Sequence, residues 1–415
     1  MRGATLRLGD MCDLVAEAVK PGARPDAPYL GLEHLGSGRL ERIGGGRASD
    51  MRSNTSAFQP GDVLYGRLRP YLDKAVLADT AGVCTTELLV LRARPGVEPR
   101  FLASIVHSPS FVEHAVAGTT GVQHPRTSWA HIREFELPAL ALDQQQQLAN
   151  LLWLVHEAIS QSESVARESQ RLERFAMQTL FTRGLRGELQ KETEIGPIPE
   201  SWAIARIGDL FEIEQGLSIK RNLANGIYGT PFLRTSNVYW GTIDLDTVSR
   251  MCIDDVPPKK LLNKGDLLVC EGGEIGRAAV WTGEIAKCLY QNHLHRLRPL
   301  DLTQVDPRFL MVWLEEGFRH RKIYEGTGNR TTIPNLSRSS LAELSIPHPP
   351  LLEQHEAVAI LQAIGRKADM HRRKCAALED MSRALLHKLM TRELLVEQLD
   401  VAELDGAVST SGQVV

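Results

Sequence analysis

Two long stretches of the chain repeat apolar or small residues at alternating intervals of three and four. The second stretch copies the first at a constant offset, since Leu361 follows Leu152 by 209 residues; Glu173 breaks the pattern. This spacing places side chains on one narrow stripe of a helix, and about 45 residues at about 1.5 Å each make a rod of about 67 Å. The pattern predicts two long helices that pair through a seam of Leu152, Val155, Ile159, Leu180, Leu361, Ile364, Leu378, Leu385 and Leu389.

Short words without helical periodicity recur between the two halves as well. Residues 61–64 (GDVL) are echoed by 265–268 (GDLL), and residues 97–102 (VEPRFL) by 305–310 (VDPRFL). The offset drifts by only about ten residues over half the chain, as insertions in loops would produce. The chain is therefore predicted to use one unit twice, a globular region followed by a long helix.

The globular regions read as mixed α/β. Short apolar runs such as Val63–Tyr65, separated by Gly, Pro and Asp turns, predict strands, and helical patterns cover Pro99–Ala117 and Pro307–Tyr324. The predicted order is a globular region over 1–142, a helix over 143–190, a linker and second globular region over 191–350, a helix over 351–397, and a flexible acidic tail over 398–415.

Composition narrows the class of protein. With 415 residues, 43% apolar and 24% charged, the chain has the make-up of an ordinary soluble protein, and no apolar run approaches the roughly 18 residues that span a bilayer, so we expect it in the cytoplasm. Six cysteines without a C-x-x-C pair indicate reduced thiols and argue against structural zinc. A net charge of −3 means that any binding to nucleic acid depends on local basic loops.

Two loops of the first half carry candidate binding chemistry. In residues 61–74 a predicted strand runs directly into a loop, and the stretch carries two arginines, a lysine and two tyrosines. Residues 66–74 are called the arginine loop; arginine can fork onto a guanine edge or a phosphate, and tyrosine can stack or hydrogen-bond nearby. The glycine loop, residues 118–129, is rich in hydrogen-bonding side chains. A solvated turn with a surface ion pair, or an ordinary loop, is the structural alternative for each.

The second half repeats both loops with other residues. The acidic loop, residues 271–277, matches the arginine loop; its glutamates could accept from cytosine, or could be structural. The second glycine loop, residues 325–332, lies in the most basic window of the chain. The candidate DNA contacts from both halves are Tyr65, Arg67, Arg69, Lys74, Thr119, Gln123, Arg126, Lys220, Arg221, Arg277, Asn329, Arg330 and Thr331.

Motifs for catalysis are missing from the sequence. It contains no G-x-x-x-x-G-K-[ST] nucleotide loop, no H-E-x-x-H, no close Cys/His ligand set and no Asn/Asp-Pro-Pro-Tyr/Phe tetrapeptide. Carboxylates beside basic residues, such as Asp73 next to Lys74, do not form the set that a nuclease needs. We therefore predict no catalytic residue and no metal site.

Several features of the chain together carry a family resemblance. They are the order of the regions, the pairs Leu137–Pro138 and Ile346–Pro347 that end the globular regions, the start of the last helix at Leu351–Gln354, and the segment 195–202 (IGPIPESW). Over residues 5–397 the chain resembles the DNA-specificity (S) subunit of Type I restriction-modification systems. The resemblance implies two target recognition domains, each reading half of a split, asymmetric DNA sequence. It also implies that the long helices form an antiparallel coiled coil whose length fixes the unread gap.

The same resemblance implies partners and cofactors. Such a subunit has no catalysis of its own and binds no cofactor; it seats two methyltransferase subunits that use S-adenosylmethionine and two restriction subunits that use ATP and Mg²⁺. Two other hypotheses stay open on the sequence. A stand-alone DNA-cleaving enzyme would show metal-dependent cleavage by the isolated chain, and a non-DNA coiled-coil scaffold would show no salt-dependent affinity for DNA.

Overall fold

The structure is a computed structural model that describes residues 4–218, 229–251, 253, 257–322, 324, 335–391 and 393. The described residues form two compact units. Unit 1 combines the residues up to 166 with those from 370 onward, and unit 2 comprises residues 167–369. The helices α5 (Leu142–Arg183) and α9 (Leu351–Met390) each contribute one segment to each unit.

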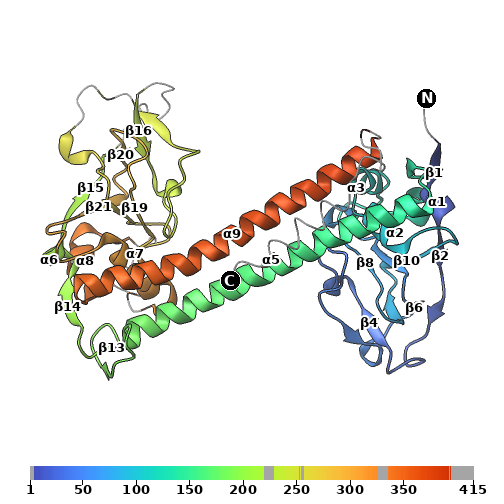
Figure 1. The fold of residues 1–415 in the computed structure, drawn as a ribbon, viewed down its shortest axis with the longest axis horizontal. Coiled ribbons are helices and arrows are strands. Elements are labelled where there is room, and N and C mark those ends of the chain that lie inside the picture. Colours follow the sequence, from blue (N-terminus) through green and yellow to red (C-terminus); the bar gives the residue numbers. More distant parts are fainter. Residues whose placement is uncertain are drawn as a thin grey trace. The chain divides into compact units, whose positions relative to one another are not determined.

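Unit 1 contains a four-stranded antiparallel sheet in the order β2-β10-β7-β8. Figure 1 labels three of these strands, β2, β10 and β8. Every residue of β7 is buried, because Val63 and Tyr65 point into one core and Leu64 into another, as alternate faces of a strand require. A second, mixed sheet in the order β3-β6-β9-β4-β5 covers the Leu64 face, and β1 pairs with β11. The strands are β1 (Thr5–Arg7), β2 (Cys12–Val15), β3 (Ala18–Val19), β4 (Pro28–Leu30), β5 (Gly46–Arg47), β6 (Thr55–Phe58), β7 (Val63–Gly66), β8 (Ala75–Leu77), β9 (Gly82–Thr85), β10 (Leu88–Ala93) and β11 (Glu136–Pro138).

Two helices, α2 (Pro99–Ile105) and α3 (Pro109–Ala117), cover the other face of the four-stranded sheet. The prediction of one helix across this range is wrong. Pro109 has no N–H to continue the helical ladder, and the Ser108 side chain accepts from Phe111 N at 3.3 Å, which starts a new helix. The short helices of unit 1 are α1 (Leu8–Met11), α4 (Trp129–Ile132) and the 3₁₀ turns η1 (Leu32–His34), η2 (Ala48–Asp50) and η3 (Pro70–Leu72).

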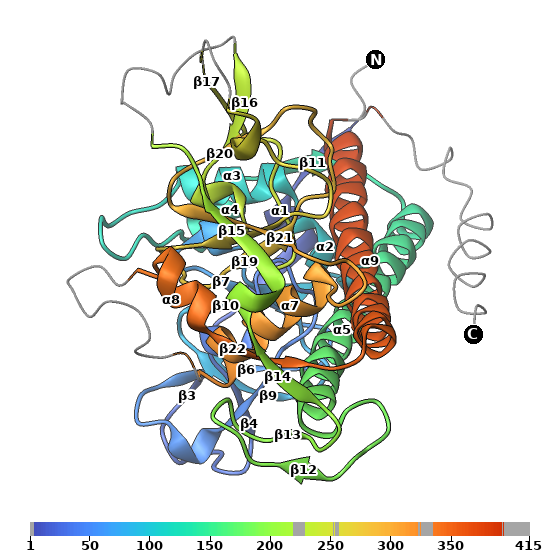
Figure 2. The same cartoon turned by 90° about the vertical axis from the view of Figure 1, so that its left-hand side faces the viewer.

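Unit 2 repeats this plan. Its four-stranded sheet has the order β15-β21-β18-β19, which matches β2-β10-β7-β8, and β14 pairs with β22 as β1 pairs with β11. Helix α7 packs on β18 and β19 (Figure 2). The strands are β12 (Gln190–Lys191), β13 (Ile198–Pro199), β14 (Ala203–Arg206), β15 (Phe211–Gln215), β16 (Thr230–Leu233), β17 (Ser249–Met251), β18 (Leu267–Cys270), β19 (Ala278–Val280), β20 (Leu289–Tyr290), β21 (Leu294–Pro299) and β22 (Ser345–His348).

The helix predicted from Pro307 to Tyr324 is shorter than expected. Its α-helical part, α7 (Pro307–Glu315), passes into a π-helical turn, η7 (Glu316–His320), which closes where Arg321 N donates to Glu316 O at 2.7 Å. The other helices of unit 2 are α6 (Ile207–Leu210), α8 (Arg338–Glu343) and the 3₁₀ turns η5 (Thr235–Asn237) and η6 (Pro258–Lys260).

Each unit contains an equivalent buried aspartate–arginine pair. Asp62, just before β7, accepts two bonds of 2.7 Å from the Arg92 guanidinium, and Asp266, just before β18, accepts two bonds of 2.7 Å from Arg298. Both aspartate side chains are only 2% exposed. A buried carboxylate requires such a partner, so the pairing fixes the start of the corresponding strand in each half. The structure thus confirms the predicted internal repeat of mixed α/β regions.

The long helices pair antiparallel within each unit. In unit 1, Val155 and Ile159 of α5 pack with Leu378 and Leu385 of α9, while Leu389 joins the core further toward the start of α5. Leu152 is buried there as well. Burial of these apolar side chains is the main stabilisation that such a helix pair gains.

In unit 2, Leu180 of α5 shares one core with Leu361 of α9, and Ile364 is half-buried. Gly365 explains how Glu173 is tolerated in the stripe, because a Cβ at residue 365 would lie 3.0 Å from the Glu173 carboxylate. The small residue leaves room for a polar one. The predicted pair of long antiparallel helices is confirmed.

The ends of the long helices differ from prediction. α5 ends at Arg183 rather than near residue 190, because Gly184 takes a φ of +63° and its N–H bonds back to Leu180 O at 2.8 Å. The following residues form the β12–β13 pair instead. Helix α9 is described to Met390, and the predicted tail over 398–415 lies outside the described residues.

Candidate nucleic-acid interface

Unit 1 brings the arginine loop and the glycine loop together. A β-bridge joins Leu68 to Arg126, and Arg69 N donates to Pro125 O at 2.7 Å. Thr127 N, in the glycine loop, also donates to the Arg67 carbonyl of the arginine loop, at 3.0 Å. The two loops that the sequence singles out separately therefore form one surface.

The arginine loop holds two guanidinium groups that are only partly bonded. Among the described residues, the buried Nε atoms of Arg67 and Arg69 have no hydrogen-bond partner. Arg69 Nη2 lies 3.5 Å from Gln123 O, at the weak end of hydrogen-bond geometry. Arg69 also has a φ of +51°, a left-handed conformation that costs a non-glycine residue about 1 kcal/mol. Because Arg69 is strained and its guanidinium is only weakly hydrogen-bonded, a ligand that supplies hydrogen-bond acceptors can bind it.

Arg126 is held by a carboxylate that sequence reasoning missed. Its Nε lies 3.0 Å from both Glu87 carboxylate oxygens, and its Nη2 donates to Oε1 at 2.8 Å. This bond to Arg126 lowers the pKa of Glu87 below its ordinary value, which keeps the carboxylate charged. Arg126 therefore serves first to position the glycine loop. No spacing in the sequence relates residues 87 and 126.

The tyrosines and the lysine near the arginine loop differ in how far their side chains are exposed to solvent. Tyr65 is 1% exposed and packs edge-on against Phe111, with ring centroids 5.3 Å apart, so its proposed role as an exposed contact is wrong. Tyr71, the second tyrosine of this stretch, is 55% exposed in the turn η3. Lys74 Nζ donates to the Leu32 carbonyl at 2.6 Å, which ties it to the fold.

Within the glycine loop the two remaining candidates differ. Gln123 is exposed, and its side chain is free to reach a ligand on the surface. Thr119 is half-buried, and its hydroxyl donates to Val116 O at 2.9 Å. The first is placed for contact and the second for holding the end of α3.

The acidic loop of unit 2 is built differently from its counterpart. Glu271 is 8% exposed, lies 3.3 Å from His293 Nδ1, and its backbone oxygen accepts from Leu336 N at 2.7 Å. These contacts give Glu271 a structural role. The glutamate available to a ligand is Glu274, which is exposed and accepts from Trp240 Nε1 at 2.6 Å.

Arg277, the candidate in this loop, lies over the Tyr239 ring at 5.5 Å, and its Nη2 donates to Thr235 O at 2.6 Å. Its Nε is buried without a hydrogen-bond partner among the described residues. Tyr239 is 49% exposed, so an aromatic face and a guanidinium edge stand side by side. The other candidates of this half lie outside the described residues: Lys220, Arg221, Asn329, Arg330 and Thr331.

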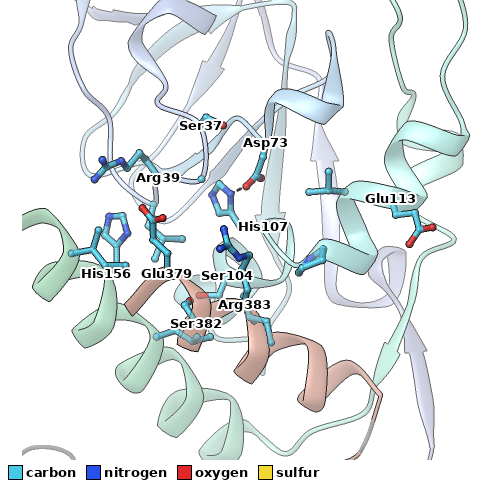
Figure 3. Close-up of a pocket in the computed structure, with 17 residues that line it drawn as sticks. Ser37, Arg39, Asp73, Ser104, His107, Glu113, His156, Glu379, Ser382 and Arg383 are labelled. Atoms are coloured by element: carbon cyan, nitrogen blue, oxygen red, sulfur yellow. Dashed lines mark hydrogen bonds and ion pairs between the residues drawn. The ribbon is translucent and has the colours of Figure 1, made fainter. Parts of the chain in front are cut away.

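Unit 1 also contains a cavity of about 590 Å³, lined by residues 37–40, Asp73, the α2–α3 segment and the two long helices (Figure 3). His107 bridges Asp73 and the Ala75 carbonyl, at 2.7 and 3.1 Å, on one wall. Arg39 and Arg383, which also line the cavity, are each paired with a carboxylate. Glu113 and Glu379 also line the cavity, so its wall carries charges of both signs.

His156, on α5, also lines this cavity. Burial, with smaller effects from Arg39 and His107, lowers the pKa of His156 to about 4. The imidazole is therefore neutral near pH 7.

The residues that the structure describes can also be compared with the requirements of a metal site, a reactive thiol and a membrane-spanning helix. Among them, no cluster of three or more His, Cys, Asp or Glu is placed to hold a metal ion. The described cysteines are buried free thiols, and burial raises the pKa of Cys12 and Cys84 to about 12. None of the helices described is long and apolar enough to cross a membrane.

Comparison with known proteins points to one family. A family model described as a Type I restriction modification DNA specificity domain matches residues 199–380. The MjaX type I restriction enzyme specificity subunit of Methanocaldococcus jannaschii is 28% identical over 210 residues, which cover 49% of this chain and 48% of that subunit. The MjaVIII specificity subunit of the same organism is 24% identical, over 68% of this chain and 67% of its own length.

A solved structure shares the fold. The S subunit of a Type I restriction-modification system from M. genitalium matches with a TM-score of 0.60 and 16% identity, over 93% of this chain and 96% of that one. The likeness therefore covers both halves of the repeat and both long helices, whereas the alignment to the MjaX subunit spans about half of that relative. Residues 199–380 thus match the DNA specificity domain of Type I restriction-modification systems, and the chain is similar in sequence to specificity subunits of such systems.

Proposed function

We propose that this chain reads a bipartite, asymmetric DNA target as the specificity subunit of a Type I restriction-modification complex. The observation that supports this is one fold present twice with different loops. The Asp62–Arg92 and Asp266–Arg298 pairs are the same in both halves, but the loops that follow β7 and β18 are basic in one half and acidic in the other. Two related domains with different loops suit two different half-sites.

The recognition domains are proposed over residues 1–142 and 191–350. In the first, the Arg67 and Arg69 guanidinium groups and the exposed Gln123 amide would contact base edges, and Arg126 would hold the loop that carries Gln123. In the second, Arg277 with the exposed Tyr239 forms the described part of the reading surface. Arginine forks onto guanine and glutamine onto adenine, so the first half-site is expected to contain such bases.

As a recognition subunit the chain is proposed to bind no cofactor and to seat two methyltransferase and two restriction subunits. Those partners would supply S-adenosylmethionine, ATP and Mg²⁺ chemistry in the cytoplasm, where the DNA is. The net charge of −3 supports shared binding, because a chain that holds DNA tightly alone is usually basic. The paired helices α5 and α9 are proposed to set the length of DNA left unread between the half-sites.

The decisive experiment is to co-express this chain with the methyltransferase subunit encoded beside it and to map methylated adenines in the host DNA. The expected result is a split motif with a fixed gap. A soluble complex with an active methyltransferase subunit that methylates no split motif would refute the proposal. Metal-dependent cleavage of DNA by the isolated chain would instead favour an enzyme.

A further inference from the structure

Two histidines stack across the base of the glycine loop. His114, on α3, and His131, on α4, have ring centroids 4.3 Å apart and ring planes within 13° of parallel. His131 Nε2 lies 2.8 Å from the His114 carbonyl, and His114 Nε2 lies 3.2 Å from the His131 carbonyl. Because a carbonyl only accepts, both rings carry their proton on Nε2 and donate it. The pair therefore closes a reciprocal link between the end of α3 and the start of α4.

Gly118 is the residue that allows this link. It is the first residue after α3, and a Cβ at this position would lie 2.0 Å from His131 Cδ2. Its φ of −92° is open to any residue, so a side chain here would clash with the ring without straining the backbone. Gly118 N also bonds the His114 carbonyl, at 3.3 Å, which joins all three residues.

The glycine loop is thus held at two places. Its base is closed by the histidine pair, and its far side is bonded to the arginine loop through the Leu68–Arg126 bridge. Between them, Thr120 and Arg126 exchange backbone bonds of 3.0 Å in both directions. The segment left to reach outward is short and contains the exposed Gln123.

We propose that His114 and His131 form a clamp that positions the glycine loop for reading the first half-site. The proposal rests on the proposed function, in which this loop contacts DNA. Both rings are half-buried, and His114 packs on Phe135 with ring centroids 5.4 Å apart, so the clamp acts through the loop. They are positioning residues, distinct from the side chains that touch bases.

The second half has no histidine at the position that matches His131. The residue 209 positions after His131 is Ser340, which lies in α8 at the same place relative to its N-cap serine, Ser337. The N-cap is kept in both halves and the histidine is not. Loss of the clamp should therefore affect one half-site and spare the other.

The test uses the full chain co-expressed with its methyltransferase subunit. The variants are Gly118→Ala and His131→Ala, with His131→Gln as a conservative variant that can still donate to the His114 carbonyl. His387→Ala, an exposed imidazole on α9 in the same unit, is the matched control. Two readouts are taken, the methylated motif and the hydrogen exchange of the glycine-loop amides.

Gly118→Ala and His131→Ala are expected to lower discrimination at the first half-site about tenfold, the effect of losing one or two hydrogen bonds of about 1 kcal/mol each. Discrimination at the second half-site should not change. The amides of Thr120 and Arg126 should exchange faster, His131→Gln should recover part of both effects, and His387→Ala should behave as the wild type.

Unchanged first-half-site discrimination and unchanged exchange in both variants would overturn the clamp. Equal loss at both half-sites would also overturn it, since that result indicates general destabilisation. If the wild type methylates no split motif, the proposed function fails on its own, and the exchange of the loop amides still decides whether the histidines hold the loop.

Discussion

Replacing Arg69 with alanine and with lysine separates base reading from phosphate binding. Arg69 lies at the junction of the two loops, with a buried Nε that has no partner among the described residues and an Nη2 that reaches Gln123 O only at 3.5 Å. Bound DNA can supply a better acceptor to Nη2. Alanine removes the charge and the fork, whereas lysine keeps the charge and loses the planar fork.

The size of the effect follows from what the guanidinium would contact. A bidentate arginine–guanine contact contributes about 1–3 kcal/mol to discrimination against the wrong base, or about 5- to 150-fold. We therefore expect both Arg69→Ala and Arg69→Lys to lose about that much discrimination at one position of the first half-site. A phosphate contact would behave differently, since alanine alone would reduce the salt slope of binding by about 0.9.

The assay is fluorescence anisotropy with the assembled complex of this chain and its methyltransferase subunit. The duplexes are the cognate target and variants with single substitutions in the first half-site, titrated between about 50 and about 200 mM salt. Arg94→Ala is the control, because Arg94 is an exposed arginine outside both loops that is paired with Asp13 at 2.6 Å. If Arg69→Ala weakens every duplex equally, or changes nothing, Arg69 does not read a base.

Three further predictions follow from the helices and the cavity. Inserting one heptad after Ser162 and another after Arg372 should lengthen the unread gap by about three base pairs, since seven residues add about 10.5 Å and a base pair about 3.4 Å; an unchanged gap in the methylated motif would refute the spacer role. Ile159→Ala should lower the free energy of unfolding in urea by about 2–3 kcal/mol, because the side chain is 7% exposed in the seam; a loss under about 0.5 kcal/mol would mean that the seam tolerates the cavity. The pKa of His156 is lowered to about 4 when folded, so the unfolded chain takes up its proton first and stability should fall by up to about 3 kcal/mol as pH drops from about 6.5 to about 4. In His156→Leu this part of the pH dependence should disappear, while His387→Ala should keep it.

The sequence predicts well whatever repeats along the chain. The three-four stripe predicts α5 and α9, and the apolar run Val63–Tyr65 predicts β7 (Val63–Gly66). The duplicated words predict that the two sheets share one strand order. These features depend on local periodicity, which a single chain shows directly.

Contacts between distant segments could not be predicted in this way. Tyr65 is the last residue of a predicted strand and a candidate contact, but β7 is covered on both faces, so its ring enters a core. The Arg126–Glu87 pair and the His114–His131 stack join residues whose spacing has no pattern. Side-chain pairs of this kind depend on the fold, and they decide which arginine is left for a ligand.

The position of the repeated bonds explains how one fold can read two sequences. In each half the buried aspartate, Asp62 or Asp266, fixes the start of a strand, and the variable loop begins at the end of that strand, four or five residues later. A change in the loop therefore leaves the carboxylate–guanidinium bonds in place. Because the bonds that hold the strand and the side chains that face a ligand lie at opposite ends of it, the loops can change from basic to acidic without loss of the sheet. Under the proposed function, this separation would let each half acquire its own half-site while the shared fold is kept.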